Sequence, residues 1–454
     1  MAPEMQSMES EVLGPEGTFA PTTAQIAMKT RPQRPEGSSL LRGGALSTID
    51  QGMVSGASFL TTVATGRACG AEGLGAYALA LGVLMTVAVA QGALLSKPYI
   101  NLHRSAERPR EYAGGTLLLT IAFGLAGALL MAAASGALAL GGAPGELTAA
   151  LLAAAAALPF VLLRDCLRQY LFAHLLLRRT LLMDAVWVGL QLAVVAALFG
   201  LGLLTPVSAF AAIGGAALVT AATGVWTLRH EFRFGAAAFR DAWRTSWRFG
   251  FWTTLSELCQ QSRTHLVQWL LVLMQGLQAA GALAAALSIV RIVNPLLLSL
   301  SNVGEPHLAR AYAEGGARKV QGIAMKMAAL ASAALAPICL LAAWQGQAVI
   351  SLLFGKSLEV EGSVLGLLLA SVALGVAAYP FSASLYAVGR PQTALNVRVL
   401  ALLAGAVSAL ALTPRLGAQG AAASLVVSAG VALLLLLVLF ARAARPSEPV
   451  PEAT

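Results

Sequence analysis

The stretch "RHEFRFGAAAFRDAWRTSWR", residues 229–248, decides how the chain is organised. It is the longest polar interruption between the apolar segments that follow one another from residue 44 to residue 442. Segments of roughly 20 apolar residues are long enough to cross a bilayer as helices. About half of these segments precede the basic stretch and half follow it. The sequence therefore predicts an all-α polytopic membrane protein of about 12 transmembrane helices, arranged as two pseudo-symmetric six-helix lobes around a central cavity.

The composition agrees with a membrane environment. The chain is 57% hydrophobic and only 11% charged, with a mean hydropathy of +0.74. A soluble domain is typically about 25% charged. The net charge of +9 could indicate a nucleic-acid partner, but most basic residues lie in short loops between apolar segments, as membrane topology requires. We therefore expect no nucleic-acid partner.

Glycine, proline and charge mark the segment boundaries. The predicted helices cover 44–68, 73–97, 113–138, 147–173, 180–202, 205–228, 248–275, 277–303, 320–344, 361–388, 391–413 and 418–441. The predicted domains are a disordered cytoplasmic arm (1–43), an N-terminal lobe (44–229), a basic cytoplasmic linker (230–247), a C-terminal lobe (248–442) and a short tail (443–454).

Lysine and arginine are distributed very unevenly over the predicted loops. They gather in alternate loops and at both ends of the chain, whereas the opposite side has only Arg67, Lys356 and Arg415. The positive-inside rule then places both termini in the cytoplasm, with the chain crossing the membrane many times.

The two halves resemble each other in sequence. Gly75-Ala76-Tyr77-Ala78 follows the first predicted helix, and Gly281-Ala282-Leu283-Ala284 follows the seventh. A repeat of six helices keeps its orientation in the membrane, so its halves are related by an axis along the membrane normal. We expect a substrate cavity between them.

Polar residues lie on one face of the seventh predicted helix. In "SELCQQSRTHLVQWL" (256–270), Glu257, Gln261 and His265 are spaced four residues apart, which places them on one side of a helix. The first predicted helix likewise has a polar face, which includes Asp50. Such faces either line a water-filled cavity or form a buried hydrogen-bonded seam between helices. We favour the cavity.

Several arginines lie inside predicted spans. Arg164 lies beside an acid, Arg263 lies on the seventh helix, and Arg291 lies near the middle of the eighth. An arginine near a helix end can instead extend to the membrane surface. An excess of inward-facing guanidinium groups suits an anionic substrate, because arginine binds phosphate in a bidentate manner. The candidate cavity residues are Asp50, Glu257, Gln261, Arg263, His265, Arg291 and Arg164.

No motif indicates catalysis, a metal or a cofactor. "FGKS" (354–357) lacks the glycine that a phosphate-binding loop requires, because Ile350 occupies that position. Cysteine and histidine show no metal-ligand spacing. Loops of no more than about 20 residues leave no room for a catalytic domain, so we expect a protein that is not an enzyme.

Stretches along the whole apolar region resemble the multidrug/oligosaccharidyl-lipid/polysaccharide exporter superfamily, and within it the polysaccharide (O-antigen type) flippases. They are "DQGMVSGASFLTTVATGRACGAEGLGAYALA" (50–80), "LRQYLFAHLLLRRTLLMDAV" (167–186), "AAGALAAALSIVRIVNPLLLSLSNVGEPHLARAY" (279–312), "LLFG" (352–355), "SLYAVGRPQTALNVRV" (384–399) and "PRLGAQGAA" (414–422). Their order and spacing carry the resemblance.

The resemblance implies alternating access and transfer of a polyprenyl-pyrophosphate-linked oligosaccharide across the membrane, for polysaccharide or lipopolysaccharide biosynthesis. It also implies membrane lipid as a partner, H⁺ or Na⁺ as a coupling ion, and a polysaccharide polymerase and glycosyltransferases as functional neighbours. The alternative is an ion-coupled multidrug antiporter of the same fold, which would need fewer inward-facing cations.

Overall fold

A computed structural model describes residues 37–291, 294–355, 362–387 and 391–444. The predicted arm (1–43) and tail (443–454) lie almost entirely outside these residues. The chain divides into two compact units, Met1–Ala45 and Leu46–Thr454. The described part of the first unit is the beginning of one helix, and all the contacts below lie within the second.

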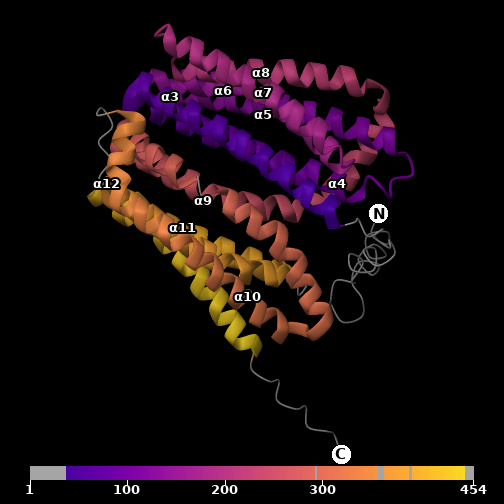
Figure 1. Cartoon of the computed structure of the whole chain (residues 1–454). Helices are drawn as coiled ribbons and strands as arrows, with labels where there is room; N and C mark the ends of the chain where they lie inside the picture. The colour runs from indigo at the N-terminus through magenta and orange to yellow at the C-terminus, as the bar shows by residue number, and fades with distance from the viewer. Residues whose placement is uncertain (1–36, 292–293, 356–361, 388–390, 445–454) are drawn as a thin grey trace, which may run out of the picture. The chain divides into compact units, whose positions relative to one another are not determined.

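Every long regular element in the described residues is an α-helix (Figure 1). The long helices are α3 (Gly37–Gln91), α5 (Pro109–Leu140), α6 (Gly145–Ala173), α7 (Leu177–Gly200), α8 (Pro206–Leu228), α9 (Ala236–Val290), α10 (Asn294–Phe354), α11 (Gly362–Ala387) and α12 (Pro391–Ala444). Three shorter elements complete the described residues: the π-helical turn η1 (Gly92–Ser96), α4 (Lys97–Leu102) and the 3₁₀ turn η2 (Arg229–Glu231). In this part of the chain, 9 helices are long and apolar enough to cross a membrane. The predicted all-α polytopic fold is confirmed.

Glycine divides three of these helices. The backbone leaves the helical region at Gly70 in α3, Gly276 in α9 and Gly417 in α12, with φ of 67°, 83° and 54°. Glycine adopts these left-handed angles without the steric cost that a Cβ atom imposes. Each divided helix spans two of the segments predicted from sequence, which reconciles the 9 continuous membrane helices with about 12 crossings.

The helices pack in two sequential groups. Helix α6 packs against α5 and α8, and α7 packs against α8, whereas α11 packs against both α10 and α12 (Figure 1). Helix α9 contacts both groups, touching α5 and η1 on one side and α11 and α12 on the other.

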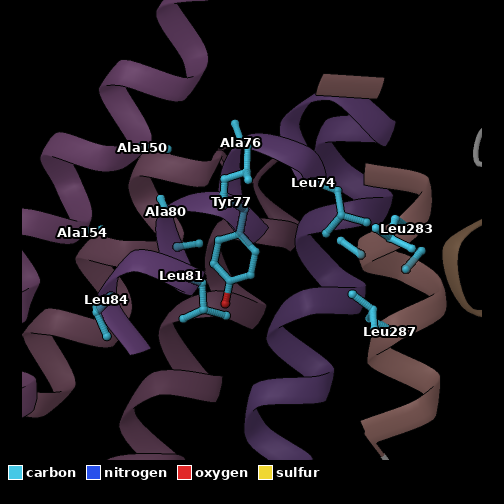
Figure 2. Close-up of a cluster of buried hydrophobic side chains, with 14 of the residues drawn as sticks. Leu74, Ala76, Tyr77, Ala80, Leu81, Leu84, Ala150, Ala154, Leu283 and Leu287 are labelled. Atoms are coloured by element: carbon cyan, nitrogen blue, oxygen red, sulfur yellow. The ribbon is translucent and has the colours of Figure 1, made fainter. Parts of the chain in front are cut away.

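The main apolar core joins α3, α6 and α9. Tyr77 of α3 is fully enclosed in it, and Leu283 and Leu287 of α9 belong to the same cluster (Figure 2). The core therefore brings the second half of α3 against the second half of α9, close to the glycine that bends each helix.

Two glycines allow these bends to meet backbone to backbone. A Cβ atom on Gly75 would collide with the carbonyl oxygen of Leu277, and one on Gly281 would collide with that of Ala71. Each glycine thus contacts the turn that precedes the other glycine. A reciprocal contact of this kind is what a two-fold axis produces, and it links the two similar tetrapeptides noted in the sequence.

Candidate functional site

The candidate residues fall into two groups in the structure. Asp50 and Arg164 lie together in a charged cluster between α3, α6 and α7. Glu257, Gln261, Arg263, His265 and Arg291 all belong to α9 or its C-cap. The polar face that includes Asp50 and the polar face that includes Glu257 therefore lie in different surroundings.

The first group, which we call the charged cluster, consists of Asp50, Arg164, Asp165, Arg168 and Asp184. Arg168 donates to Asp50 Oδ2 at 2.5 Å and to Asp184 Oδ2 at 2.6 Å. Arg164 donates to Asp165 Oδ1 at 2.7 Å and also to Asp184 Oδ1. Asp184 therefore bridges two arginines, and both arginine charges are neutralised by carboxylates.

Three of the five side chains in the charged cluster are removed from solvent, whereas Asp165 and Arg168 are partly exposed. The side chain of Asp184 is 0% exposed, that of Asp50 3% and that of Arg164 5%. The Arg164 guanidinium also lies 4.0 Å from the ring centroid of Trp187, where the negative face of the indole stabilises the cation. Buried charges persist only when they are paired in this way.

One carboxylate oxygen of the charged cluster has no partner. Asp50 Oδ1 is buried and accepts no hydrogen bond in the described residues, although Oδ2 of the same carboxylate is paired with Arg168. Two arginine and three aspartate side chains also leave a formal excess of one negative charge. A proton or a small cation bound at Asp50 would give Oδ1 a partner and would also cancel the excess negative charge.

Arg168, Asp184 and Trp187 were not among the candidates drawn from sequence. A pattern in the sequence does point to Arg168, because Arg164 and Arg168 are four residues apart and therefore share one face of α6. Asp184 is an acid in the first half of the next apolar helix. Pairing two in-span bases with acids on neighbouring spans would have identified the cluster.

The second group lies along α9. Near the start of the predicted span, half-buried Glu257 accepts from Lys97 Nζ at 3.1 Å, which joins α9 to α4. Gln261 and Arg263 follow and are also half-buried. His265 is buried, and its Nδ1 lies 3.1 Å from Gln268 Oε1. This contact joins two residues of α9, so it does not form a seam between helices.

His265 lies where α9 meets α3. Its ring packs directly on the backbone of Gly82, at a position where a Cβ atom would be 2.6 Å from Nδ1.

Arg263 and Arg291 differ from the arginines of the charged cluster. Neither forms an ion pair within the described ranges, and Arg263 Nε is buried without a partner. Arg291 is exposed, although it caps a helix segment whose preceding eight residues are all buried. An unpaired guanidinium inside a membrane protein requires water or an anion.

The structure leaves metal binding without a candidate: across the described ranges, no group of three His, Cys, Asp or Glu residues could hold a metal ion.

Comparisons with known proteins agree on the fold. The family model described as polysaccharide biosynthesis protein matches residues 40–311. The structure is similar to an inward-facing multidrug resistance MATE family transporter of the MOP superfamily, with a TM-score of 0.69, 18% identity, and coverage of 85% of this chain and 93% of that one. An outward-facing structure described in the same terms gives a TM-score of 0.64 at 18% identity, covering 90% and 98%.

A MOP superfamily transporter from Pyrococcus furiosus, reported with a binding pocket of reversed polarity, gives a TM-score of 0.63 at 18% identity and covers 90% of this chain and 98% of that one. No curated protein matches the sequence significantly.

Proposed function

Because the chain belongs to the polysaccharide biosynthesis protein family and has the fold of MOP superfamily transporters, we propose that it is a flippase for a polyprenyl-pyrophosphate-linked oligosaccharide. It would work by alternating access in the bacterial inner membrane, with both termini in the cytoplasm, and would supply polysaccharide or lipopolysaccharide biosynthesis. Its functional neighbours would be glycosyltransferases that build the glycan and a polymerase that uses it. The chain itself would carry out no chemical step.

The unpaired arginines carry this proposal. Arg164 and Arg168 are neutralised by the aspartates of the charged cluster, whereas Arg263 and Arg291 have no acidic partner within the described part of the chain. A pyrophosphate supplies the missing negative charge and accepts two parallel N–H bonds from a guanidinium. The positive charges of Arg263 and Arg291, which no described acid neutralises, therefore favour an anionic substrate.

Gln261 suits the glycan. It is half-buried on α9 and offers an amide donor and an amide acceptor. Sugar hydroxyls both donate and accept hydrogen bonds, so a group with both capacities can contact them. In this arrangement an arginine holds the pyrophosphate and the amide of Gln261 contacts the sugars.

The experiment that tests the proposal is complementation of a strain that lacks a known flippase. Arg291→Ala should abolish glycan export while the protein remains inserted at normal abundance, and Arg291→Lys should restore little, because lysine lacks the planar fork. Arg179→Ala, an exposed arginine at the start of α7, is the matched control and should export normally. Normal export by Arg291→Ala would refute the assigned role of Arg291.

A second candidate function is an ion-coupled multidrug antiporter, and the open carboxylate oxygen of Asp50 favours it. In either transporter, Asp50 is the acid placed to bind H⁺ or Na⁺. Reconstituted vesicles separate the two functions: efflux of cationic drugs, abolished by Asp50→Asn, supports the antiporter. Movement of a lipid-linked glycan that fails in Arg291→Ala supports the flippase.

A further inference from the structure

The basic linker that divides the sequence folds as the first turns of α9, and its residues form three stripes. Ala238, Ala242 and Ser246 are buried; Phe239, Trp243 and Trp247 are exposed; and Arg240, Arg244 and Arg248 are exposed. Residues four apart share a helix face, so the aromatic stripe lies between the buried stripe and the basic one. This order is typical of a helix that lies in the membrane interface.

The linker is held against the membrane end of α5. Arg233 N donates to Arg110 O at 3.0 Å, and a Cβ atom on Gly115 would collide with the carbonyl oxygen of Ala238. The linker therefore lies at the level of the first turns of α5, where the basic loops of the sequence place the membrane surface.

A hollow of about 720 Å³ lies between α5 and the linker. It is lined by Leu118, Ile121, Ala122, Leu125, Gly235, Ala236, Phe239, Arg240 and Trp243. We call it the linker groove. From Leu118 to Leu125 it follows α5 for about 10 Å into the membrane, at 1.5 Å per residue. Apolar and aromatic groups form its walls, and Arg240 is the charged group at its margin.

The charges beside the linker groove are available to a ligand. No ion pair in the described ranges involves Arg240, Arg244 or Arg248. Asp241 is the single acid among residues 232–248 and is also exposed. The surroundings of the linker groove are therefore strongly cationic, and its walls are apolar. Only an amphiphile with a negative headgroup complements both properties.

We propose that the linker groove is a binding site for an anionic phospholipid of the leaflet that the basic loops face. One acyl chain lies along Ile121 and Leu125 of α5, beside Phe239 and Trp243. The phosphate pairs with Arg240 and Arg244. A length of about 10 Å suits the upper half of an acyl chain, and the exposed aromatic residues occupy the headgroup level that they favour in membrane proteins.

The site is independent of the transport proposal, because none of its residues belongs to the charged cluster or is one of the candidate residues Glu257, Gln261, Arg263, His265 and Arg291. A bound lipid would give the linker a function beyond joining the two halves of the chain. A lipid wedged between α5 and the start of α9 fixes the point from which the second half of the chain continues.

Photocrosslinking of the full-length protein in vesicles tests the proposal. The vesicles contain phosphatidylglycerol or phosphatidylcholine with a diazirine in one acyl chain, and crosslinked peptides are mapped. We expect phosphatidylglycerol to label residues 118–125 and 235–243 far more than phosphatidylcholine does. A juxtamembrane basic residue contributes about five-fold in affinity for acidic lipid, so Arg240→Gln with Arg244→Gln should reduce this labelling by more than ten-fold.

Two further variants test the parts of the site separately. Ala122→Trp fills the linker groove without changing charge and should also abolish the labelling. Arg179→Gln, which removes an exposed arginine elsewhere on the same membrane side, should leave it unchanged. Equal labelling by both lipids, or unchanged labelling in Ala122→Trp, would overturn the proposal. So would displacement of phosphatidylglycerol by equimolar polyprenyl phosphate, which would assign the groove to the substrate tail.

Discussion

Removing the bridging acid of the charged cluster should be among the most destabilising single changes in the N-terminal half. Asp184 is fully buried and accepts from both Arg164 and Arg168. In Asp184→Ala, two guanidinium groups lose their shared partner, and Asp50 and Asp165 remain as the only neutralising acids. Leaving a buried charge without its partner costs about 3–5 kcal/mol. For a compact unit of about 400 residues, with an unfolding entropy of about 2.1 cal/mol/K per residue, this lowers Tm by about 4–6 °C.

Thermal unfolding of the purified protein in detergent measures this change, with the surviving monodisperse fraction as the readout. Asp241→Ala, which removes an exposed acid without a described ion pair, is the control and should stay within about 0.5 kcal/mol of the parent. The double variant Asp184→Ala with Arg164→Ala should be less destabilised than the sum of the two single variants, because it leaves Arg168 paired with Asp50. If Asp184→Ala behaves like Asp241→Ala, the ion pairs of the charged cluster contribute nothing to stability and our reasoning is wrong.

Three further predictions concern other parts of the chain. Gly281→Val should prevent the bends of α3 and α9 from meeting, since its Cβ atom would collide with the carbonyl oxygen of Ala71, and transport should fall at least ten-fold. Gly215→Val, where the added carbon on α8 meets open space, should transport normally. Arg67 donates to the carbonyl oxygens of Leu352 and Leu353, so Arg67→Ala should increase labelling of Leu353→Cys, at a half-buried position, by water-soluble thiol reagents. Unchanged labelling would contradict a closed contact there. Burial, with the nearby His174 and Arg104 charges, lowers the pKa of His103 below its usual 6.5, although hydrogen bonds to backbone carbonyls favour the cation. The unfolded chain therefore binds a proton more readily than the folded protein does, and thermal stability should decline as pH falls below about 6.5. This decline should be smaller in His103→Gln.

Much of the architecture could be predicted from sequence because apolar length and loop charge act locally. Most predicted spans coincide with a helix or with one side of a glycine bend, and Gly70, Gly276 and Gly417 account for the three helices that cover two spans each. The prediction for residues 277–303 was wrong in its bounds, because α9 ends at Val290 and α10 runs from Asn294 to Phe354. Proline marks a boundary only in some places, since Pro159 and Pro380 lie inside α6 and α11.

The charged groups were harder to place, because their surroundings depend on contacts between distant helices. Asp50 and Glu257 occupy similar positions on similar polar faces, yet Asp50 is buried among arginines and Glu257 pairs with a partly exposed lysine. Periodicity gives the face of a helix and not the helix that covers it. For the same reason Arg168, which is close enough to a helix end to reach the membrane surface, instead lies inside the charged cluster.

The difference between the two sets of in-span arginines explains how one protein could bind both a small cation and a large anion. In the charged cluster, three acids outnumber two bases, and the surplus is an unpaired oxygen on Asp50. On α9, Arg263 and Arg291 are without acids in the described residues, so the surplus there is positive. A membrane interior tolerates either surplus only where water or a ligand balances it. In the proposed flippase, separating the two imbalances into different helices would keep the protein's own acids from neutralising the arginines that a pyrophosphate needs. It would also let the charged cluster bind and release a cation while the anion is bound.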